Sequence, residues 1–301
     1  MMNLFAVVWD FDPVLFRLGS LDVRYYGVMW AAALILGGWI FSRFCRRESL
    51  PQSLADSAFM YIALGTILGA RLGHCLFYEP ENYLTRPWAM ITEFRDGGLA
   101  SHGATIGIII AIWLCSRRNK VSTVWMVDRL AIIATIGGAL VRLGNLFNSE
   151  IVGRETTQAW GFKFVRNFPN IAIENIPVQH PTQLYEALCY LVTFVVLMLL
   201  YRFTSAPRRR GMLFGIGMMG IFLTRFCIEF IKEVQVSFEN DMTLNMGQWL
   251  SLPFVLLGIA SIIYSLVSKP TDKVSTVEER AKGANSHTAA TTPKNSKKSN
   301  R

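Results

Sequence analysis

Seven apolar stretches of about 20 residues recur along the 301-residue chain, with polar connections between them. A helix rises 1.5 Å per residue, so about 20 residues cross the ~30 Å hydrocarbon core of a bilayer. The stretches are residues 26–44, 54–78, 99–115, 124–147, 182–201, 211–231 and 246–267. The pattern predicts an all-α polytopic membrane protein with seven transmembrane helices.

Composition and charge agree with a membrane class. The chain is 52% hydrophobic and 17% charged, which is too apolar for a soluble domain of this length. Its net charge of +9 could indicate nucleic acid, but the basic residues gather in alternate connections. That distribution favours a membrane over a nucleic-acid partner, and it places the N-terminus outside and the C-terminus in the cytoplasm. The basic residues are Arg43, Arg46, Arg47, Arg117, Arg118, Lys120, Arg202 and Arg208 to Arg210, with the C-terminal tail.

Two segments outside the stretches differ in character. Residues 269–301 are mostly Lys, Ser, Thr, Asn and Ala, so we expect a disordered cytoplasmic tail after a membrane domain of residues 1–268. Residues 148–181 are predicted to form a small packed head on the periplasmic surface. Its anchors would be Trp160, Phe162, Phe164, Val165 and Phe168.

Ionisable side chains within apolar stretches are costly, so they usually face a cavity and mark function. Arg142 and Asn145 are three residues apart and share a helical face near the outer boundary, at the depth of a phospholipid headgroup. Arginine can grip a phosphate through two parallel hydrogen bonds, and asparagine adds neutral ones. The alternative is that Arg142 only snorkels to the interface.

Arg225 and Glu229 are four residues apart in the sixth stretch. One interpretation is a structural ion pair within one helix, the cheapest way to keep both charges in a bilayer. In the other, Arg225 faces the same cavity as Arg142. Two guanidinium groups would then hold one phosphate while Glu229 orients the second of them.

Between the second and third stretches, His102 follows the glycine-rich run that begins at Asp96, Gly97 and Gly98. It is the best candidate for a base, although a histidine near an interface is often only hydrogen-bonded. Tyr26 opens the first stretch, either as part of an interfacial aromatic belt or as a donor to a phosphate or ester oxygen.

Further polar groups favour structure over chemistry. Glu186 lies one turn below Thr182, as at a capped helix start. Arg71 and His74 are expected to brace the bundle by pairing with a carboxylate such as Glu186 or Glu229. The cysteines lie within or beside the stretches without a close pair, so we expect neither disulfides nor a metal site.

Four motifs, taken together and in order, resemble the prolipoprotein diacylglyceryl transferase family. The resemblance runs from Tyr26 to about Ser268, and the long motif around Arg142 is highly specific. Val141 and Ser149 stand where the family usually has glycine, but no departure removes a charged group. The motifs are Asp96-Gly97-Gly98 to His102-Gly103, Arg142-x-Gly144-Asn145-x-x-Asn148-x-Glu150-x-x-Gly153-Arg154, His180-Pro181-x-Gln183-Leu184-Tyr185-Glu186 and Arg225 to Glu229.

The resemblance implies an enzyme of the bacterial inner membrane without a cofactor. It would move the diacylglyceryl group of phosphatidylglycerol onto the lipobox cysteine in the signal peptide of a preprolipoprotein. A thioether forms and glycerol phosphate leaves, which is the first step of lipoprotein maturation. By the same resemblance the catalytic residues are His102, Arg225 and Tyr26. The substrate-binding residues are Arg142, Asn145, Glu150, Gly153, Arg154 and Glu229.

The chemistry supports this assignment independently. The nucleophile belongs to the substrate, which explains why no cysteine of the chain lies beside a base. The leaving phosphate develops charge, and each arginine in a low-dielectric cavity can supply about 3–4 kcal/mol of stabilisation. The rival hypothesis is a transporter for an anionic solute, but we expect the charges to cluster on the outer halves, with no ionisable ladder toward the cytoplasm.

Overall fold

The computed structural model describes residues 6–19, 21–93, 98, 100–234, 239 and 242–270. These residues form two compact units, one from Met1–Phe59 with Val127–Pro270 and one from Met60–Met126. Each unit is described by itself. Nearly all of the tail predicted to be disordered lies outside the described residues.

Six of the seven predicted stretches are confirmed as helices long and apolar enough to cross a membrane, within the described part of the chain. The described part of the remaining stretch, predicted at residues 99–115, lies in a helix of 18 residues that begins at Ser101 and is not among those six. The six are α1 (Tyr25–Arg47), α2 (Gln52–Phe77), α6 (Thr123–Phe147), α7 (Thr182–Phe203), α8 (Met212–Ile228, continued to Ile231 by the 3-10 helix η5, Glu229–Ile231) and α9 (Met246–Val267). The seventh is α5 (Ser101–Arg118).

The prediction of an all-α fold is wrong in one respect, because four short strands flank the helices. β1 (Val7–Trp9) pairs in parallel with β4 (Phe162–Phe164), and β2 (Val14–Leu18) pairs with β3 (Leu21–Arg24) as a hairpin. Strands of three to five residues carry too little alternation to stand out in a sequence. The partners β1 and β4 are also far apart along the chain, so no local signal joins them.

The strand pair β1–β4 closes a small core over one end of the first unit. Phe162 and Phe164 are buried there with Leu146 and Val152, and Trp9 packs against them. Trp9 also donates from Nε1 to the Leu146 carbonyl at 3.0 Å, which ties the N-terminal strand to α6. Of the predicted aromatic anchors, Trp160 is exposed, whereas the two β4 phenylalanines are buried.

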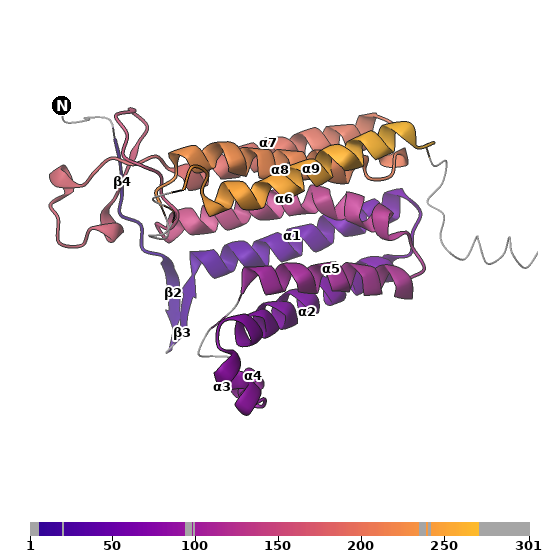
Figure 1. Cartoon of the computed structure of the whole chain (residues 1–301), viewed down its shortest axis with the longest axis horizontal. Helices are drawn as coiled ribbons and strands as arrows, with labels where there is room; N and C mark the ends of the chain where they lie inside the picture. Colours follow the sequence, from indigo (N-terminus) through magenta and orange to yellow (C-terminus); the bar gives the residue numbers. More distant parts are fainter. Residues whose placement is uncertain are drawn as a thin grey trace, which may run out of the picture. The chain divides into compact units, whose positions relative to one another are not determined.

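The helices of the first unit run alongside one another, with α8 packed between α7 and α9 (Figure 1). Its short connecting helices are η2 (Val165–Asn167), η3 (Ile173–Asn175) and η4 (Ala206–Arg208). Asp128 in α6 accepts hydrogen bonds from the backbone N–H groups of Gly211 and Phe214, both at 2.9 Å. A carboxylate from one helix thus caps the N-terminus of another, where the helix dipole favours negative charge.

The next residue, Arg129, makes a buried ion pair with Glu48 at 2.9 Å, and the Tyr201 hydroxyl donates to the same carboxylate at 2.8 Å. These charges lie at the end of α6 opposite Arg142. The expectation that charges cluster only on the outer halves is therefore wrong, because Asp128 and Arg129 sit in the first turns of α6. Both are engaged in packing contacts that join helices.

In the second unit, α2 and α5 pack antiparallel through facing stripes of small residues. The stripes are Gly65, Gly69 and Gly73 on α2 and Gly103, Gly107 and Ala111 on α5. A Cβ added at Gly69 would lie 2.9 Å from the Gly107 Cα, so only glycine permits this approach. Small residues at every fourth position are typical of helix pairs within membranes. The short helices α3 (Pro80–Thr85) and α4 (Ala89–Thr92) follow α2.

Arg71 and His74 have partners within this same unit. Arg71 donates to the backbone carbonyls of Met90 and Glu93, both at 2.9 Å. His74 Nε2 lies 3.4 Å from a carboxylate oxygen of Glu79. His74 therefore pairs with a carboxylate from the segment just after its own helix, and not with Glu186 or Glu229 as expected.

The glycine stripe predicts the effect of adding one methyl group. Gly107→Ala should destabilise the folded protein by about 1–3 kcal/mol, because the new Cβ would collide with the Gly65 carbonyl. The control is Gly137→Ala in α6, where the new Cβ would lie 3.9 Å from Ala33 and alanine favours the helix. Thermal unfolding in detergent measures both. Equal melting temperatures for the two variants would contradict the tight α2–α5 contact.

Candidate functional site

A chain of four charges, three of them buried and the fourth half-buried, lies at the end of the first unit where α6 ends and α7 begins. Arg142 Nε is 2.6 Å from Glu186 Oε2, and Lys232 Nζ is 3.0 Å from Glu186 Oε1. Lys232 Nζ is also 3.0 Å from Glu229 Oε2. The signs alternate along the chain, so each buried charge has an opposite neighbour, as low-dielectric surroundings require.

Burial is deepest at the centre of this chain. The Glu186 side chain is 0% exposed and that of Lys232 is 4% exposed, whereas that of Arg142 is 14% exposed. Arg142 is therefore not a free side chain that snorkels to the interface. Its contact with Glu186 is made by Nε, and its side chain also hydrogen-bonds the Tyr190 hydroxyl.

The predicted ion pair between Arg225 and Glu229 is not formed among the described residues. Glu229 keeps helical backbone angles and its N–H still donates to the Arg225 carbonyl, so the backbone does not prevent the pair. Glu229 pairs with Lys232 instead. Arg225 lies near Tyr190, whose hydroxyl also senses the charges of Arg142 and Glu186. Both arginines therefore act electrostatically on Tyr190, and Arg142 also hydrogen-bonds it.

The turn after α6 holds the next polar group of the motif. Asn145 Nδ2 and Asn148 Nδ2 donate to the two carboxylate oxygens of Glu150, at 3.1 and 3.0 Å. Ser149 and Ile151, on either side, have φ of +55° and +58°, a conformation unfavourable for side chains with a Cβ. Such a strained turn is stable only where contacts with the surrounding residues hold it in place.

Three successive carbonyls of this turn each accept a hydrogen bond from a side chain. The Ser149 carbonyl accepts from Asn167 at 3.0 Å, and the Ile151 carbonyl accepts from Thr182 Oγ1 at 2.7 Å. The Glu150 carbonyl accepts from Gln183 Nε2. The expected capping role of Thr182 is therefore wrong, because its hydroxyl holds the turn and does not cap α7.

Gly153 lies where three segments meet. Its N–H donates to the His180 carbonyl at 2.8 Å, and it bridges to Lys232 as an isolated antiparallel pair. A Cβ there would lie 2.6 Å from the Cβ of His180 and 2.8 Å from the Ile231 carbonyl oxygen. The neighbouring Arg154 donates from Nε to the Lys232 carbonyl at 3.2 Å. A glycine is required because any side chain would push these segments apart.

Tyr26 lies at the start of α1, directly against α6. A Cβ added at Gly144 would be 2.8 Å from the Tyr26 ring, so that glycine allows the contact. Gly144 stands between Arg142 and Asn145 in the sequence. Tyr26 therefore borders the stretch of α6 that carries both predicted ligands.

A second set of polar groups surrounds His180, just before α7. The Tyr185 hydroxyl is 3.2 Å from His180 Nδ1 and accepts a hydrogen bond from Trp160 Nε1 at 2.9 Å. Since the hydroxyl accepts from tryptophan, its own proton is available to His180 Nδ1. Burial lowers the pKa of His180, so the neutral ring that accepts this proton is favoured.

Buried polar atoms without a hydrogen-bond partner gather around this end of the unit. Among the described residues six such side-chain atoms occur, and all belong to residues of the motifs above or their neighbours. Native proteins leave few such atoms, so each of these needs a partner from outside the chain, either water or a ligand. The atoms are Asn148 Oδ1, Ser149 Oγ, Gln179 Oε1, Gln183 Oε1, Glu186 Oε2 and Arg225 Nε. Glu186 Oε2 contacts Arg142 by charge, without the alignment of a hydrogen bond.

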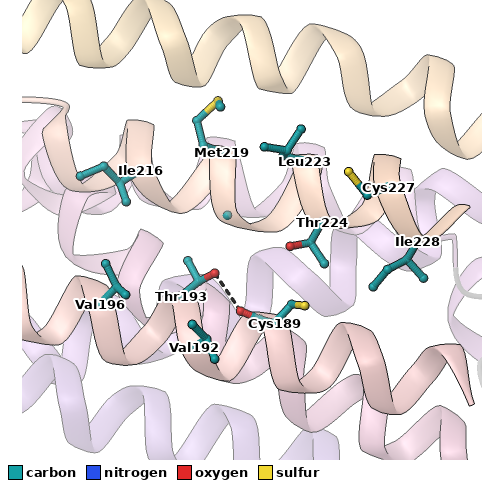
Figure 2. Close-up of a pocket in the computed structure, with 11 residues that line it drawn as sticks. Cys189, Val192, Thr193, Val196, Ile216, Met219, Leu223, Thr224, Cys227 and Ile228 are labelled. Atoms are coloured by element: carbon teal, nitrogen blue, oxygen red, sulfur yellow. Dashed lines mark hydrogen bonds between the residues drawn. The ribbon is translucent and has the colours of Figure 1, made fainter.

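An apolar groove runs between α7 and α8 from this polar region (Figure 2). Its volume is about 530 Å³. Cys189 is one turn from Glu186 along α7, and Ile228 precedes Glu229, so the groove begins beside the charged chain. Val196 and Ile216 line its far end (Figure 2).

His102 belongs to the second unit, in the first turn of α5. Its ring lies 5.4 Å from the Phe77 ring and 5.6 Å from the Tyr78 ring, centroid to centroid. The side chain is exposed. The preceding residues Asp96, Gly97 and Leu99 lie outside the described residues.

Sequence reasoning missed two members of the charged chain. In the sequence analysis, Glu186 is given a capping role. Glu186 lies within an apolar stretch, however, and an ionisable residue there is a candidate functional residue by the same argument that selects Arg225. Lys232 was not singled out, because it follows the sixth stretch in a polar connection where lysine is usually solvated. Its burial depends on the turn made by η5, which no local pattern predicts.

Comparisons with known proteins agree with these motifs. The model of the family "Prolipoprotein diacylglyceryl transferase" matches residues 13–264. A phosphatidylglycerol--prolipoprotein diacylglyceryl transferase of Porphyromonas gingivalis is 49% identical over 282 residues, covering 89% of this chain and 98% of the relative. Proteins of the same name from Bacteroides fragilis and Tolumonas auensis are each 42% identical, covering 85% and 87% of this chain and 94% and 98% of the relatives. The chain belongs to the prolipoprotein diacylglyceryl transferase family.

Proposed function

We propose that this protein transfers the diacylglyceryl group of phosphatidylglycerol to the lipobox cysteine of a prolipoprotein, the first step of lipoprotein maturation. The observation that carries the proposal is the buried charged chain with its cluster of unpartnered polar atoms. Arg142 and Arg225 supply cations at one place, and a phosphate diester is the anion that suits them. The names of the relatives state this activity for those proteins.

The reaction follows from these groups. The substrate thiol loses its proton, and its sulfur attacks the glycerol carbon that bears the phosphate. The carbon–oxygen bond breaks and its electron pair leaves with glycerol phosphate, so charge develops on the phosphate oxygen. Arg142 and Arg225 stabilise that charge, and Tyr26 adds a hydroxyl donor beside them. His102 is proposed to accept the thiol proton.

The unpartnered hydrogen-bond acceptors near the end of α6 suit the headgroup of phosphatidylglycerol. Phosphatidylglycerol carries two free hydroxyls beyond its phosphate, and each needs an acceptor when it leaves water. Asn148, Gln179 and Gln183 each present an unpartnered side-chain amide oxygen, and the Glu150 carboxylate is held by two amides. We propose that Asn145, Glu150, Gly153 and Arg154 shape this part of the site.

The groove between α7 and α8 is proposed to hold one acyl chain of the phospholipid. Along α8 it extends from Ile228 to Ile216, about 18 Å at 1.5 Å per residue. That is close to half of the ~30 Å hydrocarbon thickness, the depth of one leaflet. A lipid whose phosphate lies at Arg142 would reach the groove directly, because the groove begins beside Glu186.

The full topology is part of the proposal. We propose that α5 is the seventh span, which its glycine contact with α2 supports. The basic connections then place the N-terminus and residues 148–181 in the periplasm and the C-terminus in the cytoplasm of a cell with an inner membrane. The substrates would therefore meet the site at the outer leaflet.

The transporter alternative lacks support. The charges at the opposite end, Asp128 and Arg129, are held by a helix N-terminus and by Glu48. A conduction path needs groups that can release their partners to a moving ion. The family to which the chain belongs is one of transferases.

The function and the role of Arg142 are tested together. Purified wild-type protein in lipid vesicles, given labelled phosphatidylglycerol and a lipobox peptide, should form the labelled thioether. Arg142→Lys should lose activity by about 100-fold or more, because an ammonium cannot contact Glu186 and also form a planar fork with phosphate. The control is Arg129→Lys, which alters a buried Arg–Glu pair away from the site. An inactive wild type would refute the function, whereas a fully active Arg142→Lys would refute only the role of Arg142.

The groove is tested by filling it. Val192 and Val195 are both exposed on α7, but only Val192 lines the groove. Val192→Trp should raise the KM for long-chain phosphatidylglycerol several-fold and affect a short-chain analogue less. Val195→Trp adds the same bulk outside the groove and should change neither value. Equal effects of the two variants on the KM would refute the assignment of the acyl chain to this groove.

The role of His102 is tested by pH. A thiol has a pKa of about 8.5, so the need for a base falls as pH rises. His102→Gln keeps size and hydrogen bonding, and it should bind lipid normally but turn over slowly at neutral pH. Its rate relative to wild type should recover in part at raised pH. A variant that is equally inactive at every pH and binds lipid weakly would instead assign His102 a structural or lipid-holding role.

A further inference from the structure

We infer that Lys232 is a positioning residue that holds Arg142 in its phosphate-binding orientation through Glu186. This inference rests on the proposed function and deepens it. It starts from the location of Lys232, which is 96% buried and lies between two carboxylates at 3.0 Å each. Lysine is almost never buried unless its charge is paired.

The Lys232 side chain determines which carboxylate oxygen of Glu186 is available to Arg142. Lys232 occupies Oε1 of Glu186, and the Nε of Arg142 lies 2.6 Å from Oε2. Arginine and a carboxylate otherwise prefer to make two parallel hydrogen bonds. Without Lys232 the free Oε1 would draw a terminal nitrogen of Arg142 into such a pair. That nitrogen would then be lost to the phosphate.

Lysine suits this task better than a second arginine. Its ammonium is compact and has three donors that can be divided between two acceptors. One donor goes to Glu186 and one to Glu229, the two oxygens lying on separate helices. Lys232 therefore also joins the end of α8 to α7, where the apolar groove begins.

The backbone of Lys232 is held by the loop that contains Gly153. Arg154 donates from its backbone N–H to the Ile231 carbonyl at 2.8 Å and from Nε to the Lys232 carbonyl at 3.2 Å. On the other side, the Glu233 N–H donates to the Val152 carbonyl at 3.1 Å. Gly153 lies between these contacts and admits no Cβ. Its requirement for glycine is explained if its task is to place Lys232.

The experiment is a double-mutant cycle on enzyme in vesicles, with KM for phosphatidylglycerol, kcat and melting temperature measured for each variant. Lys232→Met should raise the KM at least ten-fold, and Lys232→Arg should recover part of the loss because it restores the charge. Since Lys232 acts through Glu186, the variant Lys232→Met with Glu186→Gln should be no worse than Glu186→Gln alone. The control is Lys163→Met, a lysine that donates to the carbonyls of Ile173 and Glu174.

Each other outcome overturns the inference. Additive losses in the double variant would show that Lys232 acts on the substrate directly. A lower melting temperature with unchanged KM and kcat would reduce Lys232 to a structural ion pair. If Lys232→Met fails to fold, the double variant, which removes one charge of each sign, still supplies the comparison with Glu186→Gln. An inactive wild type would refute the proposed function itself, so the two failures are distinguishable.

The same reasoning predicts a shared phenotype for Gly153. Gly153→Ala would push Ile231 and Lys232 away from the loop, so its KM should rise in the same way as that of Lys232→Met. Combining Gly153→Ala with Lys232→Met should add little, because both act on the same contact. Fully additive effects on KM would separate Gly153 from Lys232.

Discussion

The alternating chain Arg142–Glu186–Lys232–Glu229 is the constraint on which the site depends. Removing an ion from water costs several kcal/mol even after relaxation, and truncating one partner of a buried pair typically costs 3–5 kcal/mol. Four such charges are tolerable here because each faces an opposite one within 3.0 Å. The helices α6, α7 and α8 must therefore keep fixed positions along one another, since a shift of any one would leave a buried charge without its partner.

The loop after α6 serves the same constraint from outside the helices. Ser149 and Ile151 have positive φ, which costs free energy for residues with a Cβ. Hydrogen bonds to three successive carbonyls, together with the amide grip on Glu150, hold the turn in this shape. The turn places Gly153 against the backbone of Lys232. A strained loop is thus stabilised locally so that a distant lysine can be placed.

The sequence predicted the features that depend on the length and polarity of its segments, namely the helices and the charged residues within them. Apolar runs set the helices, because hydrocarbon leaves a spanning segment few alternatives. Arg142 and Arg225 were found because charge in such a run is conspicuous. The strands β1 and β4 could not be found, since three-residue pairings distant in sequence leave no period. Nor could the partner of Glu229, because Lys232 lies beyond the end of α8 in a polar connection, where lysine is usually solvated.

The two ends of the first unit use buried charge in opposite ways, and this asymmetry supports the proposal of a site near the end of α6. Near the start of α6, Asp128 accepts two backbone N–H groups and Glu48 accepts from both Arg129 and Tyr201. Near the end of α6, buried polar atoms within the described residues lack partners. Satisfied groups rigidify a structure, whereas unsatisfied groups gain free energy only when a ligand arrives. The proposed headgroup site therefore lies at the end with unsatisfied groups, whereas the satisfied groups at the opposite end hold the helices together.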